Sequence, residues 1–185
     1  LLVYLSRINS YVDRHKRITV PAIVTAAEMQ RSAYDMNLTL HLFLEQVTKT
    51  GAEDTLARLT MHTDGIRQSL QLYRSTHAAR THPILLGMLD QHQRLDLADQ
   101  EDRAVAEIDH ALQELNGLWS AALAQPQATT TSQSPTTRAD ALIAKLTHNL
   151  DQLVAAHRDI DVEMKLEGDR LLQQARMIAL GLVAV

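Results

Sequence analysis

The amino-acid sequence predicts an all-α fold, and three observations support this prediction. Apolar residues recur at alternating steps of three and four along most of the chain, which is the period of a helix that buries one face. Aromatic residues are only 3% of the 185, and there are only 6 glycines and 4 prolines, too few for the many turns of a β-sandwich or barrel. Four such stretches predict an antiparallel up-down-up-down four-helix bundle with long first and last helices, as a single domain over residues 1–185.

The composition excludes several classes of protein. At 45% hydrophobic and 22% charged residues, the chain resembles ordinary globular domains, so most of it is expected to be ordered. The formal net charge of −4 gives no broad basic surface, which argues against a nucleic-acid partner. Because there are no cysteines, a disulfide framework, a thiolate zinc site and a cysteine nucleophile are all impossible.

The first helix is predicted from Leu2 to Lys49. Pro21 lies inside it and cannot donate a backbone hydrogen bond, so a kink is expected near Arg17 and Ile18. Its inward positions are Ile8, Val12, His15, Thr19, Ala22, Ala26, Met29, Ala33, Met36, Leu40, Phe43 and Val47.

The second helix is predicted from Glu53 to Ala79, because Thr50 and Glu53 have the spacing of a capping box. Its inward positions are Leu56, Leu59, Thr63, Ile66, Leu70, Tyr73 and His77.

The third helix is predicted from Pro83 to Ala124, since proline is well tolerated as a first helical residue. Its apolar stripe slips between Leu95 and Ile108, in a stretch crowded with acidic residues, so a bend or break is expected there. Its inward positions are Leu85, Met88, His92, Leu95, Ala98, Val105, Ile108, Leu112, Leu115, Trp119 and Ala122.

A flexible loop is predicted over residues 125–136, because its polar composition offers nothing to bury. The last helix is predicted from Arg138 to Val185, with Thr137 and Asp140 in the positions of a capping box. Its inward positions are Ile143, Leu146, Leu150, Leu153, His157, Ile160, Met164, Glu167, Leu171, Gln174 and Ile178.

Both ends of the chain carry short runs without charge, over residues 1–5 and 177–185. A membrane span needs about 20 apolar residues, so we expect each run to be the stub of a transmembrane helix. Four helices of alternating direction bring the two stubs to the same end of the bundle, where both can enter one membrane.

The chain resembles the four-helix-bundle extracytoplasmic sensor domains of bacterial histidine kinases and methyl-accepting chemotaxis receptors. The resemblance covers the whole chain, and it is carried by residues 25–29, 42–53 and 70–73 together with the two apolar stubs. It implies a non-catalytic periplasmic domain of an inner membrane protein, placed between two transmembrane helices. It further implies that the domain senses a small molecule or a periplasmic binding protein and pairs with a second copy, as a weak homodimer when excised. The pattern carries no ligand-binding signature.

Two alternatives belong to other classes: a structural or adaptor bundle that binds proteins, and a haem- or metal-carrying bundle. Di-iron bundles need a Glu-x-x-His pair on each of two helices, and only Glu107 and His110 have that spacing here. The stretch from Ser75 to Pro83 resembles a kinase phosphoacceptor box, but Ala78 replaces the acidic residue expected after His77. We therefore expect neither an enzyme nor a resident cofactor.

A ligand site is predicted from levels along the bundle. If Leu5 and Arg176 share a level, positions whose numbers add to about 181 do so too, since each helical residue rises about 1.5 Å. Arg31 then lies opposite Leu150, unless it simply pairs with Asp35 one turn on. Donors that would surround Arg31 and hold a carboxylate or another anion are Gln30, Tyr34, Lys145, His148 and Asn149.

Overall fold

The computed structural model describes residues 2–45, 49–124 and 133–183, and within these ranges the chain is helical and contains no strand. The prediction of an all-α fold is therefore confirmed. Six α-helices occupy these ranges, together with one π-helical turn and one 3₁₀ turn. In chain order they are α1 (Leu2–Arg14), the π turn η1 (His15–Thr19), α2 (Val20–Glu45), α3 (Lys49–Thr76), the 3₁₀ turn η2 (Ala79–Thr81), α4 (Pro83–Gln91), α5 (Leu95–Ala124) and α6 (Gln133–Val183).

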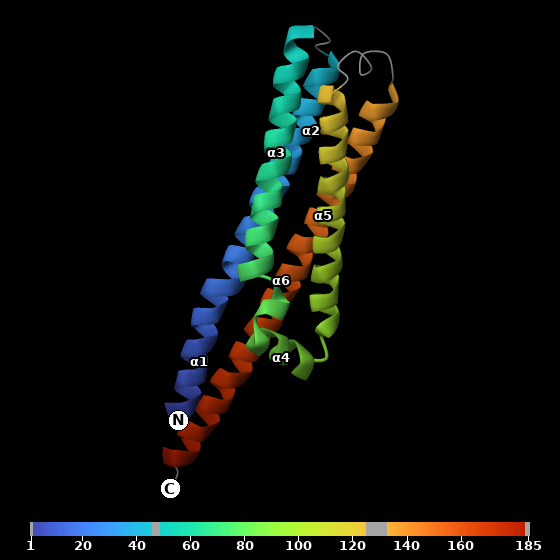
Figure 1. Cartoon of the computed structure of the whole chain (residues 1–185). Helices are drawn as coiled ribbons and strands as arrows, with labels where there is room; N and C mark the ends of the chain where they lie inside the picture. Colours follow the sequence, from blue (N-terminus) through green and yellow to red (C-terminus); the bar gives the residue numbers. More distant parts are fainter. Residues whose placement is uncertain (1, 46–48, 125–132, 184–185) are drawn as a thin grey trace.

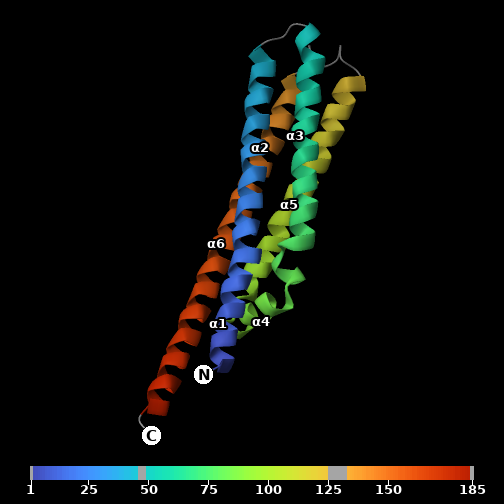
Figure 2. The same ribbon diagram turned by 90° about the vertical axis from the view of Figure 1, so that its left-hand side faces the viewer.

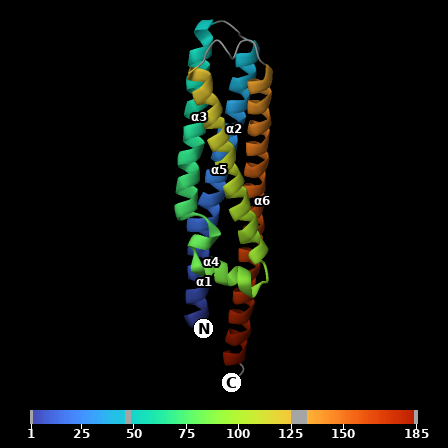
Figure 3. The same ribbon diagram turned by 45° about the vertical axis from the view of Figure 1, so that its right-hand side comes forward.

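The long helices lie side by side. α2 packs against α3 and α6, and α5 packs against the same two helices, while α1 continues α2 along α6. Both ends of the chain lie at the same end of the molecule (Figures 1 and 2). The short helix α4 lies across the long helices nearer to that end (Figure 3).

The interior holds two groups of buried apolar side chains. The larger group joins α2, α3, α5 and α6, and includes Met29, Leu59, Ile108, Leu146 and Leu153. The smaller group lies beneath α4 and consists of Ile18, Ala79, Leu85, Leu89, Leu97, Ala98, Ile160 and Met164.

The first predicted helix is interrupted where the proline requires it. Pro21 has no N–H to donate to the Arg17 carbonyl, and the π turn His15–Thr19 interrupts the α-helix at the position where the kink was predicted. The end predicted at Lys49 is wrong, because α2 ends at Glu45 and α3 already begins at Lys49.

The predicted stripe of the first helix is buried from Thr19 to Leu40 and fails before the π turn. Val12 is 41% exposed although an inward position was predicted for it. A π turn contains one more residue than an α turn, so it rotates the face that precedes it.

The start predicted for the second helix is also wrong. α3 begins at Lys49, which leaves Thr50 inside the helix, where it has no role as a cap, and the helix ends at Thr76 rather than at Ala79. The predicted inward stripe from Leu56 to Tyr73 is buried, as expected.

The third predicted helix begins at Pro83, as predicted, but it consists of two helices. α4 stops at Gln91 and α5 starts at Leu95, with Gln93 between them at φ 57°, a left-handed conformation that ends α4. The break lies just before the stretch in which it was expected. Leu95 starts α5 beside this break and is 39% exposed, so its predicted inward position is wrong.

The last helix begins at Gln133, five residues before the predicted start, so Thr137 and Asp140 lie inside α6 and do not form its cap. Pro135 is compatible with this start because N–H groups in the first turn have no intrahelical acceptor. Of the loop predicted over residues 125–136, the last four residues are helical, and residues 125–132 lie outside the described ranges.

The lower part of α6 departs from its predicted stripe. The stripe is buried from Ile143 to Met164 and again at Leu171, but Glu167 is only partly buried, Gln174 is exposed and Ala175 is buried in its place. Within residues 2–45, 49–124 and 133–183, no helix combines the length and apolar character of a membrane span.

Candidate functional site

The levels predicted from the sequence are confirmed by two side-chain contacts between α2 and α6. The Gln30 amide donates to a carboxylate oxygen of Asp151. His41 Nε2 lies 3.8 Å from Asp140 Oδ1. In both pairs the residue numbers add to 181, so the two helices are antiparallel in the expected register.

The six predicted ligand-binding residues do not all converge. Arg31 and Tyr34 are exposed on α2, and no hydrogen bond or ion pair joins Arg31 to another described residue. Gln30 faces α6, but Lys145 Nζ contacts Glu107 Oε2 on α5 at 2.6 Å. His148 is exposed and shares a 3.0 Å hydrogen bond with Gln152, and buried Asn149 leaves its amide nitrogen without a partner in the described chain.

Two of these donors are already bound to carboxylates of the chain itself. Asp151 accepts from Gln30, and Glu107 accepts from Lys145, whose hydrogen bond lowers the pKa of the Glu107 carboxyl. Spacing along the helices gave the level of each residue but not the direction in which its side chain points. Of the predicted donors, Arg31 is thus the cation still open to an external anion within the described ranges.

A buried polar cluster lies lower in the molecule and consists of Tyr73, Glu101 and His157, from α3, α5 and α6. The Tyr73 hydroxyl donates to Glu101 Oε1 at 2.5 Å and also contacts His157 Nε2. His157 Nε2 lies 3.1 Å from the same carboxylate oxygen. Glu101 Oε2 accepts the backbone N–H of Ala79 at 2.9 Å, so this one carboxylate binds the turn η2 to three long helices.

The three side chains of the Tyr73 cluster are all buried. Burial raises the pKa of the Tyr73 phenol, and the negative charge of Glu101 raises it further. His157 Nδ1 has no hydrogen-bond partner in the described chain. Next to the cluster, burial lowers the pKa of the His77 imidazole, and His157 lowers it further.

The sequence contained a signal for part of this cluster. Tyr73 and His157 occupy inward positions of the predicted stripes, and polar side chains at such positions require partners. Glu101 could not be identified, because it stands among Asp96, Asp99 and Asp102 in a stretch that reads as a solvated face.

A second polar cluster joins the end of α4 to α6. His92 Nδ1 lies 2.9 Å from Glu163 Oε2, and His92 Nε2 lies 3.1 Å from Glu167 Oε2. Arg94 Nη1 contacts Glu163 Oε1 at 2.7 Å, and Arg170 Nη1 lies 3.2 Å from His92 Nε2. We refer to these five residues as the His92 cluster.

Both clusters connect separate helices through polar contacts. Among residues 2–45, 49–124 and 133–183, no group of three or more His, Asp or Glu side chains is arranged to hold a metal ion. Glu107 and His110, which have the di-iron spacing, instead contact Lys145 and Glu114.

Comparisons of the chain with protein families, with curated proteins and with solved structures find no match.

Proposed function

We propose that the chain is the extracytoplasmic ligand-sensing domain of a membrane-bound signal-transduction receptor, of the histidine kinase or chemoreceptor kind. The supporting observation is the position of α6. This 51-residue helix packs against α1, α2, α4 and α5, so a displacement of α6 changes its contacts with most of the molecule. The domain itself is non-catalytic, and it relays ligand binding to cytoplasmic modules.

The proposed architecture is an up-down-up-down four-helix bundle. The packing of α2 and α5 against the same two helices, α3 and α6, supports this arrangement. α1 and α6 reach the same end of the molecule together, so their relative displacement would be delivered there (Figure 1). In the proposed receptor this end faces the inner membrane and the domain lies in the periplasm.

The signal in this proposal is a shift between two packings of α6. A ligand that binds one packing more tightly displaces the equilibrium by the difference between its two affinities. Such a shift would have to break the Tyr73 cluster, because its hydrogen bonds join α3, α5 and α6 at one level of the molecule.

The proposed ligand is a small organic anion bound at Arg31, and no cofactor is required. The open guanidinium of Arg31 matches a carboxylate in geometry and charge. The proposed protein partner is a second copy of the chain, held weakly. Supporting this pairing, the outer face of α2 carries apolar side chains that are between 44% and 60% exposed, namely Val20, Val24, Tyr34, Leu38 and Leu42.

Binding is tested by titrating citrate, malate and succinate into the protein in a calorimeter. Binding should be lost in Arg31→Ala and retained in Arg58→Ala, a matched variant whose exposed guanidinium pairs with Asp54 on α3. If none of the three acids binds the wild-type chain, the anion specificity is wrong.

Relay is tested separately by pulsed electron resonance. The chain has no cysteine, so spin labels can be attached at Ser10→Cys on α1 and Gln173→Cys on α6, both exposed. Saturation with a bound acid should change the distance between the two labels. An acid that binds without changing this distance would show that the domain does not transmit its binding through α6.

A further inference from the structure

His92 stands at the end of α4 with both ring nitrogens turned to carboxylates of α6. Its side chain is only 6% exposed, against 12% for Glu163 and 27% for Glu167. The two glutamates are four residues apart on α6, so they lie one turn apart on the same face. A single imidazole therefore spans one turn of α6.

The protonation state of His92 decides which of these contacts can be hydrogen bonds. A neutral imidazole has one N–H donor, whereas an imidazolium has two. Two carboxylates facing two ring nitrogens are both satisfied only by the imidazolium. A neutral ring that keeps its Nδ1 proton still donates to Glu163, but its Nε2 lone pair then faces Glu167 with no proton between them.

Arg170 supplies the alternative partner for the neutral ring. Its Nη1 lies 3.2 Å from His92 Nε2, close enough to donate to that nitrogen once it carries a lone pair. Nε2 thus has two competing neighbours on α6, an acceptor at Glu167 and a donor at Arg170. The proton on Nε2 decides between them.

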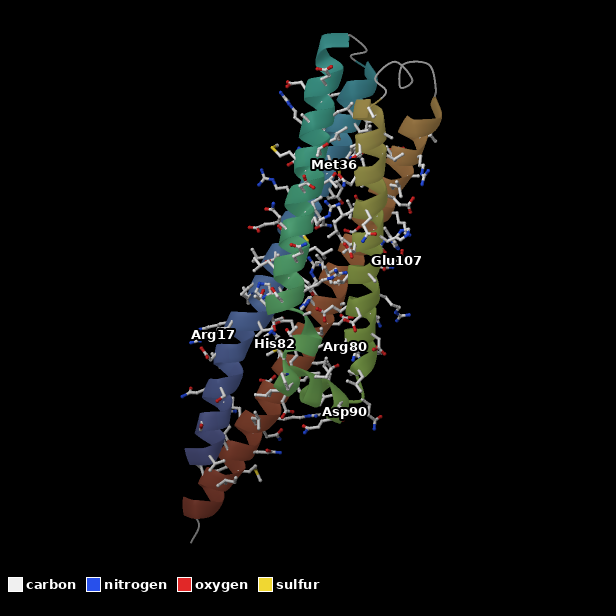
Figure 4. The ribbon with its side chains drawn as sticks, viewed as in Figure 1. Arg17, Met36, Arg80, His82, Asp90 and Glu107 are labelled. Atoms are coloured by element: carbon white, nitrogen blue, oxygen red, sulfur yellow. The ribbon has the colours of Figure 1, made fainter. Side chains whose placement is uncertain are left out.

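The other charged groups around α4 come from α5, α6 and the segment between α4 and α5. Glu163, Glu167 and Asp96 are three carboxylates, and Arg94 and Arg170 are two guanidiniums, so the imidazolium brings the total to zero. α5 contributes Asp96 through its contact with Arg94. On η2, Arg80 is bound to Asp99 and Asp102 of α5, and Asp90 is exposed on α4 (Figure 4).

We propose that His92 is a proton-controlled latch between α4 and α6. In the protonated state the ring bridges Glu163 and Glu167. In the neutral state Nε2 accepts from Arg170 and Glu167 is released, so the two ion pairs of the ring are replaced by hydrogen bonds to Glu163 and from Arg170. Histidine changes charge between about pH 5 and 8, so the latch is closed at the acidic end of this range and loosened at the other.

The latch lies beside the apolar group beneath α4. Met164 follows Glu163 directly, packs in that group and accepts a hydrogen bond from Thr19 of the π turn at 2.9 Å. Leu85 and Leu89 of α4 complete the group. Opening of the latch therefore weakens the packing of α4 against Ile160 and Met164. It exposes this part of the interior without unfolding the long helices. The latch does not depend on the proposed receptor function.

Amide hydrogen exchange of the segment 89–96 tests the latch, because its backbone bonds include Arg94 N–H to Leu89 O at 2.7 Å and His92 N–H to Met88 O at 3.0 Å. After correction for intrinsic rates, protection in the wild type should fall on the order of tenfold between pH 5 and 8. In His92→Gln protection should not vary with pH. His110→Gln, which removes a comparable histidine–glutamate pair from the surface of α5, should behave as wild type. Protection that is constant in the wild type, or that still falls in His92→Gln, overturns the latch.

A second measurement needs no folded His92→Gln variant. Nitrogen NMR of the labelled imidazoles reports which ring nitrogen carries the proton, and the His92 signal is identified by its change in Glu167→Gln. At pH 8 the latch requires a proton on Nδ1 and a lone pair on Nε2, and at pH 5 protons on both. A proton found on Nε2 alone at pH 8 contradicts the exchange of Glu167 for Arg170.

Discussion

The side-chain amide of Gln30 on α2 donates to the carboxylate of Asp151 on α6, across 121 positions of the sequence. The contact fixes the register of two helices that the sequence alone placed opposite each other. Because the chain contains no cysteine, this register can be tested by cross-linking two introduced thiols. We expect Gln30→Cys with Asp151→Cys to be joined within one molecule by a short bis-maleimide.

The matched control moves one thiol along α6. Gln174 is exposed like Asp151, but it lies 23 residues further on, about 35 Å along the helix axis. Gln30→Cys with Gln174→Cys should therefore stay unlinked. Equal cross-linking of the two double variants, read by mass spectrometry, would mean that the register is wrong.

An introduced charge on the buried apolar face of α6 is expected to destabilise the fold. Leu153 is fully buried in the larger apolar group, so Leu153→Asp places an unpaired carboxylate among apolar side chains. The free energy of unfolding should fall by about 4 kcal/mol or more, measured by urea denaturation followed by circular dichroism. Gln174→Asp, on the exposed face of the same helix, should change it by less than about 0.5 kcal/mol.

The sequence predicted the fold well where periodicity carried the information. Buried stripes such as Leu56 to Tyr73 and Ile143 to Leu153 follow from the spacing of apolar residues, because the apolar face of a helix is the face that packs against its neighbours. Helix ends depended on capping patterns at Thr50 and Thr137, and both residues lie inside helices. Short polar motifs recur by chance within helices, so they locate an end poorly unless a break in the apolar stripe accompanies them.

The sites were harder to predict than the fold. Level arithmetic brought Gln30 to α6 correctly, but it could not show that Asp151 and Glu107 already occupy two of the predicted donors. The Tyr73 and His92 clusters each join residues from separate helices, and the partners Glu101 and Glu163 read locally as ordinary surface acids. Which surface acid turns inward depends on the rotation of its helix, and this is set by packing with distant segments.

Self-association is expected to be weak and to use the exposed face of α2. Sedimentation velocity at rising concentration should show a monomer–dimer equilibrium in the micromolar to millimolar range. Leu38→Lys places a charge on this face and should weaken association about tenfold, while the free energy of unfolding changes by less than about 0.5 kcal/mol. Met61→Lys introduces the same charge at an exposed position of α3 and should leave association unchanged. A tight dimer at nanomolar concentration, or a strict monomer at millimolar, would contradict this prediction.

The Tyr73 phenol is expected to make the protein sensitive to alkali. Burial and the charge of Glu101 raise its pKa, so the folded chain keeps a proton that the unfolded chain loses near pH 10. The contribution of the phenol to the free energy of unfolding is therefore fully present below about pH 10. Above this pH the free energy of unfolding falls by up to about 1.4 kcal/mol per pH unit from this one group. Tyr73→Phe should remove this part of the alkaline slope, although the variant is itself less stable at pH 7 by about 1 to 3 kcal/mol because Glu101 loses a donor.

The control is Tyr34→Phe on the exposed face of α2, which should keep both the wild-type stability and the wild-type slope. Urea denaturation between pH 8 and 11 measures the slope, and an identical slope in wild type and Tyr73→Phe would show that the phenol ionises within the folded protein.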